Sequence, residues 1–266
     1  IPKDVQFQKK KYLNFKKKKK LNSKSHNQFS QKNIDELIKL MSKATKPIFY
    51  TGGGVINSGP KASELLRELV NVTGFPITSI LQGLGAYPGN DNYFLGMLGM
   101  HGSYEANNAM HDCDLMINIG ARFDDRITND PAQFALGSKK IHIDIDPASL
   151  SKIIKVDVPI VGSAKTCLTQ LLKELKKNES KLDKEKIQPW RDQIKDWRSI
   201  HGLNHEMLQE TSSSGKILPQ QVIQSLYKET KGEAYVTSDV GQHQMFAAQY
   251  YHFDKPRRWI NSGGLG

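Results

Sequence analysis

Short apolar runs alternate with helix-periodic segments along most of this sequence. The runs are residues 47–51, 75–80, 115–119, 140–145 and 156–161, and they are typical of buried strands. Residues 33–43, 60–72, 103–112 and 164–177 lie between or beside them and have the pattern of helices. Strands that alternate with helices favour a parallel sheet covered on both faces. We therefore predict an α/β fold built on a parallel sheet.

The sequence changes character after residue 178. Residues 179–216 are rich first in charge and then in serine and glycine, which predicts a linker. Beyond it, residues 220–230 and 242–251 are predicted helices, with a predicted strand at 234–237 between them. We therefore expect a second α/β unit that begins near residue 217.

The net charge of +11 comes almost entirely from the amino-terminal segment. Residues 1–32 hold 11 lysines and one acidic residue, a charge of +10, which leaves +1 for the rest of the chain. A nucleic-acid-binding arm would combine arginine with stacking aromatic side chains, and Tyr12 and Phe15 are the only aromatics near the lysines before Phe29. The segment is therefore predicted to be a solvated linker, with no nucleic-acid partner. A basic nucleic-acid-binding protein remains the weakest alternative.

Composition excludes further classes of protein, and the chain ends indicate a piece of a longer polypeptide. No apolar run approaches the roughly 20 residues of a membrane-spanning helix, so we predict no membrane association. The 2 cysteines, Cys113 and Cys167, are too few for a disulfide scaffold or a cysteine-based zinc site. The sequence begins at Ile1 rather than methionine and ends in a glycine-rich turn, so we expect an internal piece of a longer polypeptide.

Polar and glycine-rich residues follow three of the predicted strands. These segments are Gly52-Gly53-Gly54, residues 120–126 with two arginines and two aspartates, and Asp144-Ile145-Asp146. Ligands of parallel sheets bind at the carboxyl ends of the strands, where glycine admits phosphate, arginine binds anions and a carboxylate accepts ribose hydroxyls. The three segments together predict a nucleotide cofactor. The sequence has no G-x-G-x-x-G with an acid about 20 residues on, which disfavours a simple NAD dehydrogenase.

Several motifs together resemble one enzyme family. They are residues 98–102 (Leu-Gly-Met-His-Gly), 120–126 (Gly-Ala-Arg-Phe-Asp-Asp-Arg), 144–147 (Asp-Ile-Asp-Pro), 240–245 (Val-Gly-Gln-His-Gln-Met) and 258–266. In order and spacing they resemble the large catalytic subunits of acetolactate synthases, which depend on thiamine diphosphate. The resemblance implies condensation of two pyruvates, or of pyruvate and 2-ketobutyrate, with loss of CO2. Pyruvate oxidase, glyoxylate carboligase or a non-catalytic flavin-binding module remain alternatives.

The resemblance also implies a domain organisation. Residues 1–6 would end an N-terminal pyrimidine-binding domain, and residues 7–32 would be the lysine-rich linker. Residues 33–178 would form a Rossmann-like central domain that binds FAD, followed by the linker at 179–216. Residues 217–266 would then begin a C-terminal diphosphate-binding domain.

Site residues are carried over from the resemblance position by position. Those implied to contact FAD are Gly52, Gly53, Gly54, Ile80, Leu81, Leu98, Gly99, Met100, His101, Gly120, Ala121, Arg122, Phe123, Asp124, Asp144, Ile145, Ser163 and Ala164. At the end of the last central strand the family has Gly-Asp where this sequence has Gly162-Ser163-Ala164, and serine supplies no carboxylate. Those implied to bind thiamine diphosphate are Val240, Gly241, Gln242, His243 and Gly266. Arg126 is implied to orient the second 2-keto acid.

The resemblance places other parts of the machinery outside this sequence. The glutamate that activates thiamine would precede Ile1, and the motif that binds Mg2+ would follow Gly266, so we predict no catalytic residue and no metal ligand here, and no activity for this piece alone. The expected partners are 2-keto acids, further copies of the subunit in a homodimer or tetramer, and a small regulatory subunit. The expected compartment is the cytoplasm, or the plastid for a eukaryotic source.

Overall fold

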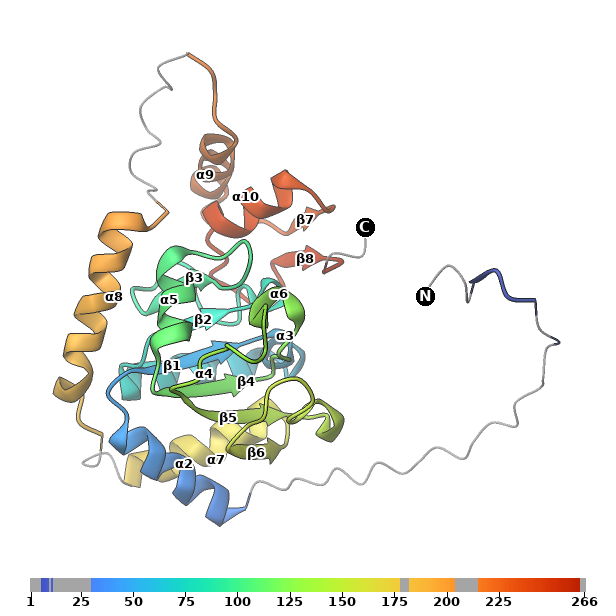
Figure 1. Ribbon diagram of the computed structural model, residues 1–266. Helices are drawn as coiled ribbons and strands as arrows, with labels where there is room; N and C mark the ends of the chain where they lie inside the picture. Colours follow the sequence, from blue (N-terminus) through green and yellow to red (C-terminus); the bar gives the residue numbers. More distant parts are fainter. Residues whose placement is uncertain (1–5, 10, 12–29, 178–181, 204–214, 264–266) are drawn as a thin grey trace.

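The computed structural model describes residues 6–9, 11, 30–177, 182–203 and 215–263. The described residues after position 30 form a larger α/β unit and a smaller unit at the carboxyl side (Figure 1). The two units pack against each other through the end of the larger unit's sheet that carries β3 and β2.

Six parallel strands form the centre of the larger unit, in the order β3-β2-β1-β4-β5-β6. Their bounds are β1 Pro47–Thr51, β2 Ile77–Ser79, β3 Phe94–Met97, β4 Leu115–Ile119, β5 Lys139–Asp144 and β6 Val158–Val161. The pairing of the strands confirms the predicted parallel sheet. β1 and β4 are buried at every residue, as expected of strands covered on both faces. β3 was not predicted: it is short, contains Gly96 and shifts register against β2.

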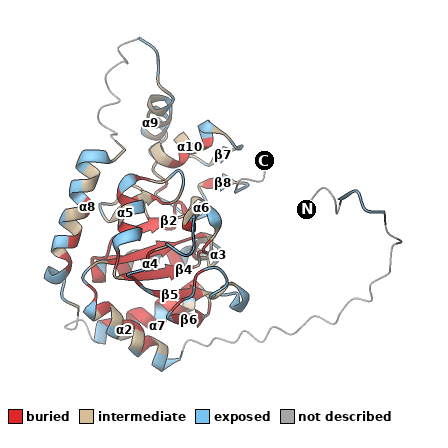
Figure 2. Cartoon of the chain, viewed as in Figure 1, coloured by how far each residue is buried: buried red, intermediate tan, exposed pale blue. Residues whose placement is uncertain are grey.

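Helices cover both faces of this sheet, and the two apolar layers are distinct. On one face, α2 (Gln31–Lys43), α4 (Pro60–Thr73) and α7 (Ala164–Lys177) share a core with the β1 side chain of Phe49. On the other face, α5 (Tyr104–Asp112) and α8 (Gln188–His201) pack over Ile48 and Met116. Figure 2 shows the buried residues concentrated on the sheet and on the inner sides of these helices. Two shorter helices, α3 (Gly53–Asn57) and α6 (Asp125–Thr128), follow β1 and β4.

Helix α8 corrects the predicted linker at residues 179–216. Trp190 is buried in this helix, and its indole N–H donates to the Pro47 carbonyl at 3.1 Å. Ile194 and Trp197 extend the same apolar side onto α5 and β1. Apart from this side most of the helix is charged or polar, and Ile200 is exposed, which obscured its period in the sequence. Most of residues 182–203 therefore belong to the larger unit.

The smaller unit consists of α9 (Pro219–Thr230), β7 (Val236–Ser238), α10 (Gln242–Tyr250) and β8 (Trp259–Asn261). β7 and β8 pair in parallel, and the predicted strand and helices of this region are confirmed. Tyr251, Phe253 and Trp259 form an apolar cluster with Leu84 and Met97 of the larger unit. The units therefore share a continuous apolar contact. No helix within the described ranges has both the length and the apolar character needed to cross a membrane.

Candidate cofactor-binding site

The carboxyl ends of all six strands lie along one edge of the sheet. Backbone hydrogen bonds continue the ladder past the strands and join each strand-end segment to its neighbour. The N–H groups of Leu98, Ile80, Gly52, Gly120 and Gly162 donate to the carbonyls of Ser79, Thr51, Ile119, Ile143 and Asp144, respectively, at 2.8–3.3 Å. The structure thus brings together all six segments that the sequence assigned to flavin. They form one continuous edge.

Two strand-end segments meet at the centre of this edge with no side chain between them. The Gly54 N–H donates to the Gly120 carbonyl at 2.9 Å, and Gly120 has a φ of 64°. A Cβ atom on Gly52 would lie 2.6 Å from the Gly120 carbonyl oxygen. The glycines after β1 are therefore required by the close approach of two backbones. This crossing lies where the strand order reverses, the place where open α/β sheets bind their ligands.

A row of buried polar side chains supports the segment after β4, and the sequence did not reveal it. Tyr50, Asn118 and His142 occupy the same register on β1, β4 and β5, and none of them is exposed. The Asn118 amide donates to the Ala121 carbonyl at 2.7 Å and accepts from the Ala121 N–H at 3.1 Å. The Tyr50 hydroxyl donates to the Arg122 carbonyl at 3.1 Å. Tyr50 and Asn118 of this row therefore fix the backbone of residues 121 and 122 by hydrogen bonds.

Aromatic packing and burial complete the support of this segment. The Phe123 ring is buried and makes edge contact with His142, with the ring centres 5.2 Å apart. Burial raises the pKa of the Tyr50 phenol well above its usual value, and the Asp124 carboxylate adds to that shift while Arg122 opposes it. Tyr50 thus stays a neutral hydrogen-bond donor. In the sequence, only Asn118 stands out as a single polar residue within an otherwise apolar predicted strand.

The segment after β3 is clamped from two sides. The Asn107 side chain on α5 accepts from the Gly99 N–H at 2.8 Å and donates to the Gly99 carbonyl at 3.0 Å. On the other side, the Met100 N–H donates to the Arg126 carbonyl at 3.1 Å. Leu98 is buried, whereas Met100 is 58% exposed and His101 is also exposed. The clamp therefore fixes the backbone of a segment whose Met100 and His101 side chains are exposed, and Asn107 is a further residue that the sequence did not reveal.

Arg126 and part of this segment line a pocket of about 610 Å3. It is lined by the segment after β3, by one side of α5 and by the residues after β4. The lining residues are Leu98, Gly99, Met100, Asn107, Met110, His111, residues 126–130 and residues 133–135. Arg126 is exposed, and its N–H donates to the Asp124 carboxylate at 3.2 Å, which caps α6. The Arg122 side chain is 79% exposed and lies 3.9 Å from the same carboxylate. Two arginines therefore stand at the carboxyl edge with guanidinium groups open to an anion.

Residues after β5 and β6 occupy the far end of the edge. The Asp144 carboxylate accepts from the Asp146 N–H at 2.8 Å and lies 3.7 Å from the His142 ring. Ile145 is 70% exposed beside it. The Ser163 hydroxyl accepts from the Thr166 N–H at 3.2 Å, so that it caps α7, and Ala164 is buried. Asp144 therefore places a carboxylate at this end of the edge, whereas the Ser163 hydroxyl is used to cap α7.

The turn between β7 and α10 holds the residues assigned to thiamine diphosphate. Val240 is 42% exposed, Gly241 is the N-cap of α10, and Gln242 and His243 are exposed in the first turn. No side chain caps this helix end, so its amide groups and dipole are available to an anion, which suits a diphosphate. Gly266 lies outside the described residues.

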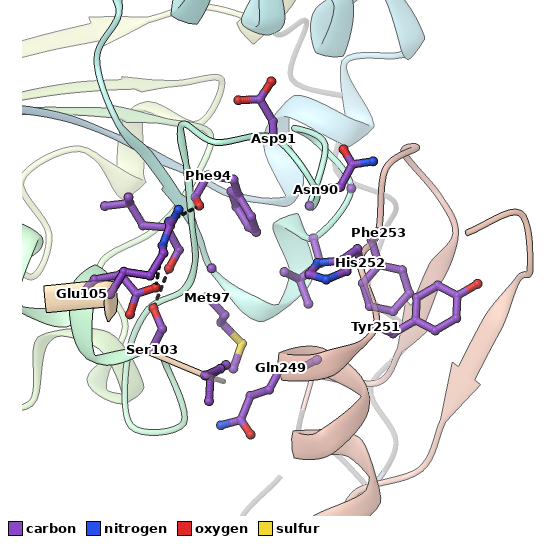
Figure 3. A pocket seen from close by; sticks show the side chains of 18 of the residues that line it. Asn90, Asp91, Phe94, Met97, Ser103, Glu105, Gln249, Tyr251, His252 and Phe253 are labelled. Carbon is purple, nitrogen blue, oxygen red and sulfur yellow. Dashed lines mark hydrogen bonds and ion pairs between the residues drawn. The ribbon is translucent and has the colours of Figure 1, made fainter. Parts of the chain in front are cut away.

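A second, smaller pocket of about 260 Å3 lies between the two units (Figure 3). Phe94, Met97 and Glu105 line one side of it, and Gln249 and His252 line the other. Burial lowers the pKa of the His252 imidazole. None of the residues assigned to a cofactor lines this pocket. Across the described ranges, no three His, Cys, Asp or Glu side chains gather closely enough to hold a metal ion.

Comparison with known families identifies this arrangement. The profile described as "Thiamine pyrophosphate enzyme, central domain" matches residues 34–171, which is the unit with the six-stranded sheet. The chain belongs to the thiamine pyrophosphate enzyme family. The profile described as "Thiamine pyrophosphate enzyme, C-terminal TPP binding domain" matches residues 239–266 of this thiamine pyrophosphate enzyme, which include the turn before α10. Both matches support thiamine diphosphate, the same compound as thiamine pyrophosphate, as a cofactor.

Individual relatives of this thiamine pyrophosphate enzyme are named acetolactate synthases. The isozyme 3 large subunit of Escherichia coli (strain K12) is 48% identical over 233 residues, which cover 88% of this chain and 39% of the relative. The large subunit of Buchnera aphidicola subsp. Schlechtendalia chinensis is 44% identical over 268 residues, covering 100% of this chain and 46% of the relative. Acetolactate synthase 1, chloroplastic, of Nicotiana tabacum is 42% identical over 233 residues. The chain spans less than half the length of these relatives.

Proposed function

We propose that this chain is part of an acetolactate synthase large subunit. In that reaction two pyruvates, or pyruvate and 2-ketobutyrate, condense with loss of CO2 in branched-chain amino-acid biosynthesis. The observation that carries the proposal is 48% identity to a bacterial large subunit across both units. That similarity favours this reaction over those of pyruvate oxidase and glyoxylate carboligase.

The two proposed cofactors are assigned to two places described above, the carboxyl edge of the sheet and the turn before α10. FAD would lie along the carboxyl edge of the sheet, supported by the glycine crossing at Gly52 and Gly120 and by the Asp144 carboxylate. The diphosphate of thiamine diphosphate would lie against the amino end of α10, where Gly241, Gln242 and His243 contribute donors. Thiamine diphosphate supplies an electron sink for decarboxylation when bound, and Mg2+ would be held by residues outside this chain.

Arg126 is proposed to bind the carboxylate of the second keto acid. Its guanidinium is exposed at the wall of the larger pocket, and a planar fork matches a carboxylate in a bidentate way. The proposed assembly is a homodimer or tetramer of the whole subunit with a small regulatory subunit. The proposed compartment is the cytoplasm, because the bacterial relatives are more similar to this chain than the chloroplastic one.

The test is the product formed from pyruvate by the protein expressed with its natural flanking coding sequence. Acetolactate is the expected product, and hydrogen peroxide or acetate as the main product would reject the proposal. A purified protein that holds flavin but forms no product would instead support the non-catalytic module. DNA binding that disappears when residues 6–32 are deleted would support the nucleic-acid alternative.

A matched pair of arginine variants tests the role of Arg126. Arg126→Gln is expected to raise the KM for the keto acids at least tenfold while the flavin content stays unchanged, because a charged bidentate contact is lost. Arg257→Gln removes an exposed arginine from the turn before β8 that does not line the larger pocket, and it should leave KM unchanged. Equal KM values for both variants would contradict the assignment.

A further inference from the structure

Two glutamine side chains join the smaller unit to the proposed flavin-binding segments. The Gln82 side-chain amide, in the turn after β2, donates to the Asn261 carbonyl of β8 at 3.0 Å. The Gln249 side-chain amide, near the carboxyl end of α10, donates to the His101 carbonyl at 2.9 Å. Each bond therefore joins a segment of the sheet edge to the smaller unit, which carries the turn proposed to bind the diphosphate (residues 239–243, the diphosphate turn).

Asn261 holds both sides of the turn that is proposed to bind the diphosphate. Its side-chain oxygen accepts from the Gln244 side-chain amide at 2.8 Å and from the Gly263 N–H at 2.8 Å. Its amide nitrogen donates to the Ser238 carbonyl at 3.0 Å. Ser238 ends β7 immediately before the turn, and Gln244 lies in the first turn of α10. The position of Asn261 therefore sets the distance between the strand and the helix that flank the turn.

Gln82 is fixed on the flavin side by glycine contacts. A Cβ atom on the next residue, Gly83, would lie 2.8 Å from Cα of Gly52, so the two backbones touch. A Cβ atom on Gly53 would lie 3.3 Å from the Gln82 carbonyl oxygen. A ligand that orders the glycine segment after β1 must therefore also order Gln82. Because packed backbones have few alternative arrangements, this contact passes on a displacement instead of absorbing it.

We propose that Gln82 and Gln249 are positioning residues that couple the two cofactor sites. Binding of FAD along the sheet edge orders the Gln82 turn and the His101 carbonyl, and the two glutamines transmit that order to Asn261 and α10. The diphosphate turn at residues 239–243 then becomes ordered before thiamine diphosphate arrives. By linkage, thiamine diphosphate tightens FAD by the same factor, and such couplings are about 5- to 150-fold. This inference rests on the proposed binding of FAD.

Hydrogen exchange of the 266-residue chain with FAD alone tests the coupling without thiamine diphosphate or turnover. The measured quantity is the exchange rate of the amides in residues 239–245, with and without saturating FAD. In the unsubstituted chain, FAD is expected to slow this exchange about fivefold or more. Gln82→Met and Gln249→Met should each reduce the effect, and the double variant should abolish it, because methionine keeps the side-chain length and loses the donor.

Arg67→Met is the matched control. The Arg67 guanidinium crosses the same interface and donates to the Asp254 carbonyl at 2.6 Å, but it touches neither proposed cofactor segment. It should preserve the FAD-dependent protection. Loss of protection in this variant, or full protection in the double glutamine variant, would overturn the assignment. FAD binding without protection of residues 239–245 in the unsubstituted chain would overturn the coupling alone, whereas failure to bind FAD at all would overturn the proposed flavin site and the coupling with it.

Discussion

Replacing Asn118 with leucine tests whether the buried row beneath the sheet edge supports the segment after β4. Asn118 makes two hydrogen bonds to the backbone of Ala121, which is 1% exposed, so water cannot replace them. Leucine has a similar volume and satisfies neither group. An unsatisfied buried group costs about 1–3 kcal/mol, so Asn118→Leu should lower the free energy of unfolding by about 2–6 kcal/mol.

The measurement is thermal unfolding followed by circular dichroism, together with the FAD dissociation constant. A loss of about 2–6 kcal/mol corresponds to a fall in Tm of at least about 4 °C for a unit of this size. Thr169→Val is the control, because the Thr169 hydroxyl is exposed and donates to the Lys165 carbonyl within α7, so its loss should change the free energy of unfolding by less than about 0.5 kcal/mol. An Asn118→Leu protein within about 1 kcal/mol of the unsubstituted chain would refute the reasoning.

Three further perturbations test other parts of the structure. Gly120→Ala should cost about 2–5 kcal/mol and weaken FAD at least tenfold, because φ is 64° and a Cβ would lie 2.7 Å from a neighbouring backbone carbon; Gly137→Ala, with no atom within 4 Å of its Cβ, should be neutral by urea titration. Burial raises the pKa of Cys113 and of Cys167 to about 12, so the fold keeps both thiols neutral. Their contribution to the free energy of unfolding is therefore fully present below the unfolded pKa of about 8.5, and it falls as pH rises from there toward 12. Urea midpoints at pH 7 and 10, compared with those of a double alanine variant, measure that loss, and an unchanged pH dependence in the variant would contradict it. Trp190→Ala should cost about 3–5 kcal/mol by the same assay, whereas a residue in a linker would cost less than about 0.5 kcal/mol.

The sheet, and the edge at which we propose that FAD binds, could be predicted because both depend on local sequence. β1 and β4 are largely apolar runs followed by glycine, a pattern typical of strands buried on both faces. β3 escaped prediction because a strand of four residues with an internal glycine has too little period to recognise. α8 escaped because only one narrow side of it is buried, among residues that are otherwise charged or polar.

The supporting residues of the site could not be predicted for a different reason. Asn107, Asn118 and Gln82 act through hydrogen bonds to residues that are 8, 3 and 179 positions away, respectively, and a side-chain amide carries no signal of its partner. The Ser163 position shows the reverse case. The sequence indicated that it lacks the carboxylate of the family, and the structure gives it the separate task of capping α7.

The position of α8 in the chain has a consequence for synthesis on the ribosome. The apolar surface that α8 covers, which includes Ile48, Met110 and Cys113, is formed from segments made well before it. At about 5–20 residues per second, the last of the six strands is synthesised roughly 1.5–6 seconds before Trp190. During that interval the nascent domain presents this patch to chaperones and to neighbouring chains. Slow codons between residues 162 and 190 would lengthen this interval. The synthesis of α8 thus sets the time at which the apolar patch is covered and no longer available for aggregation.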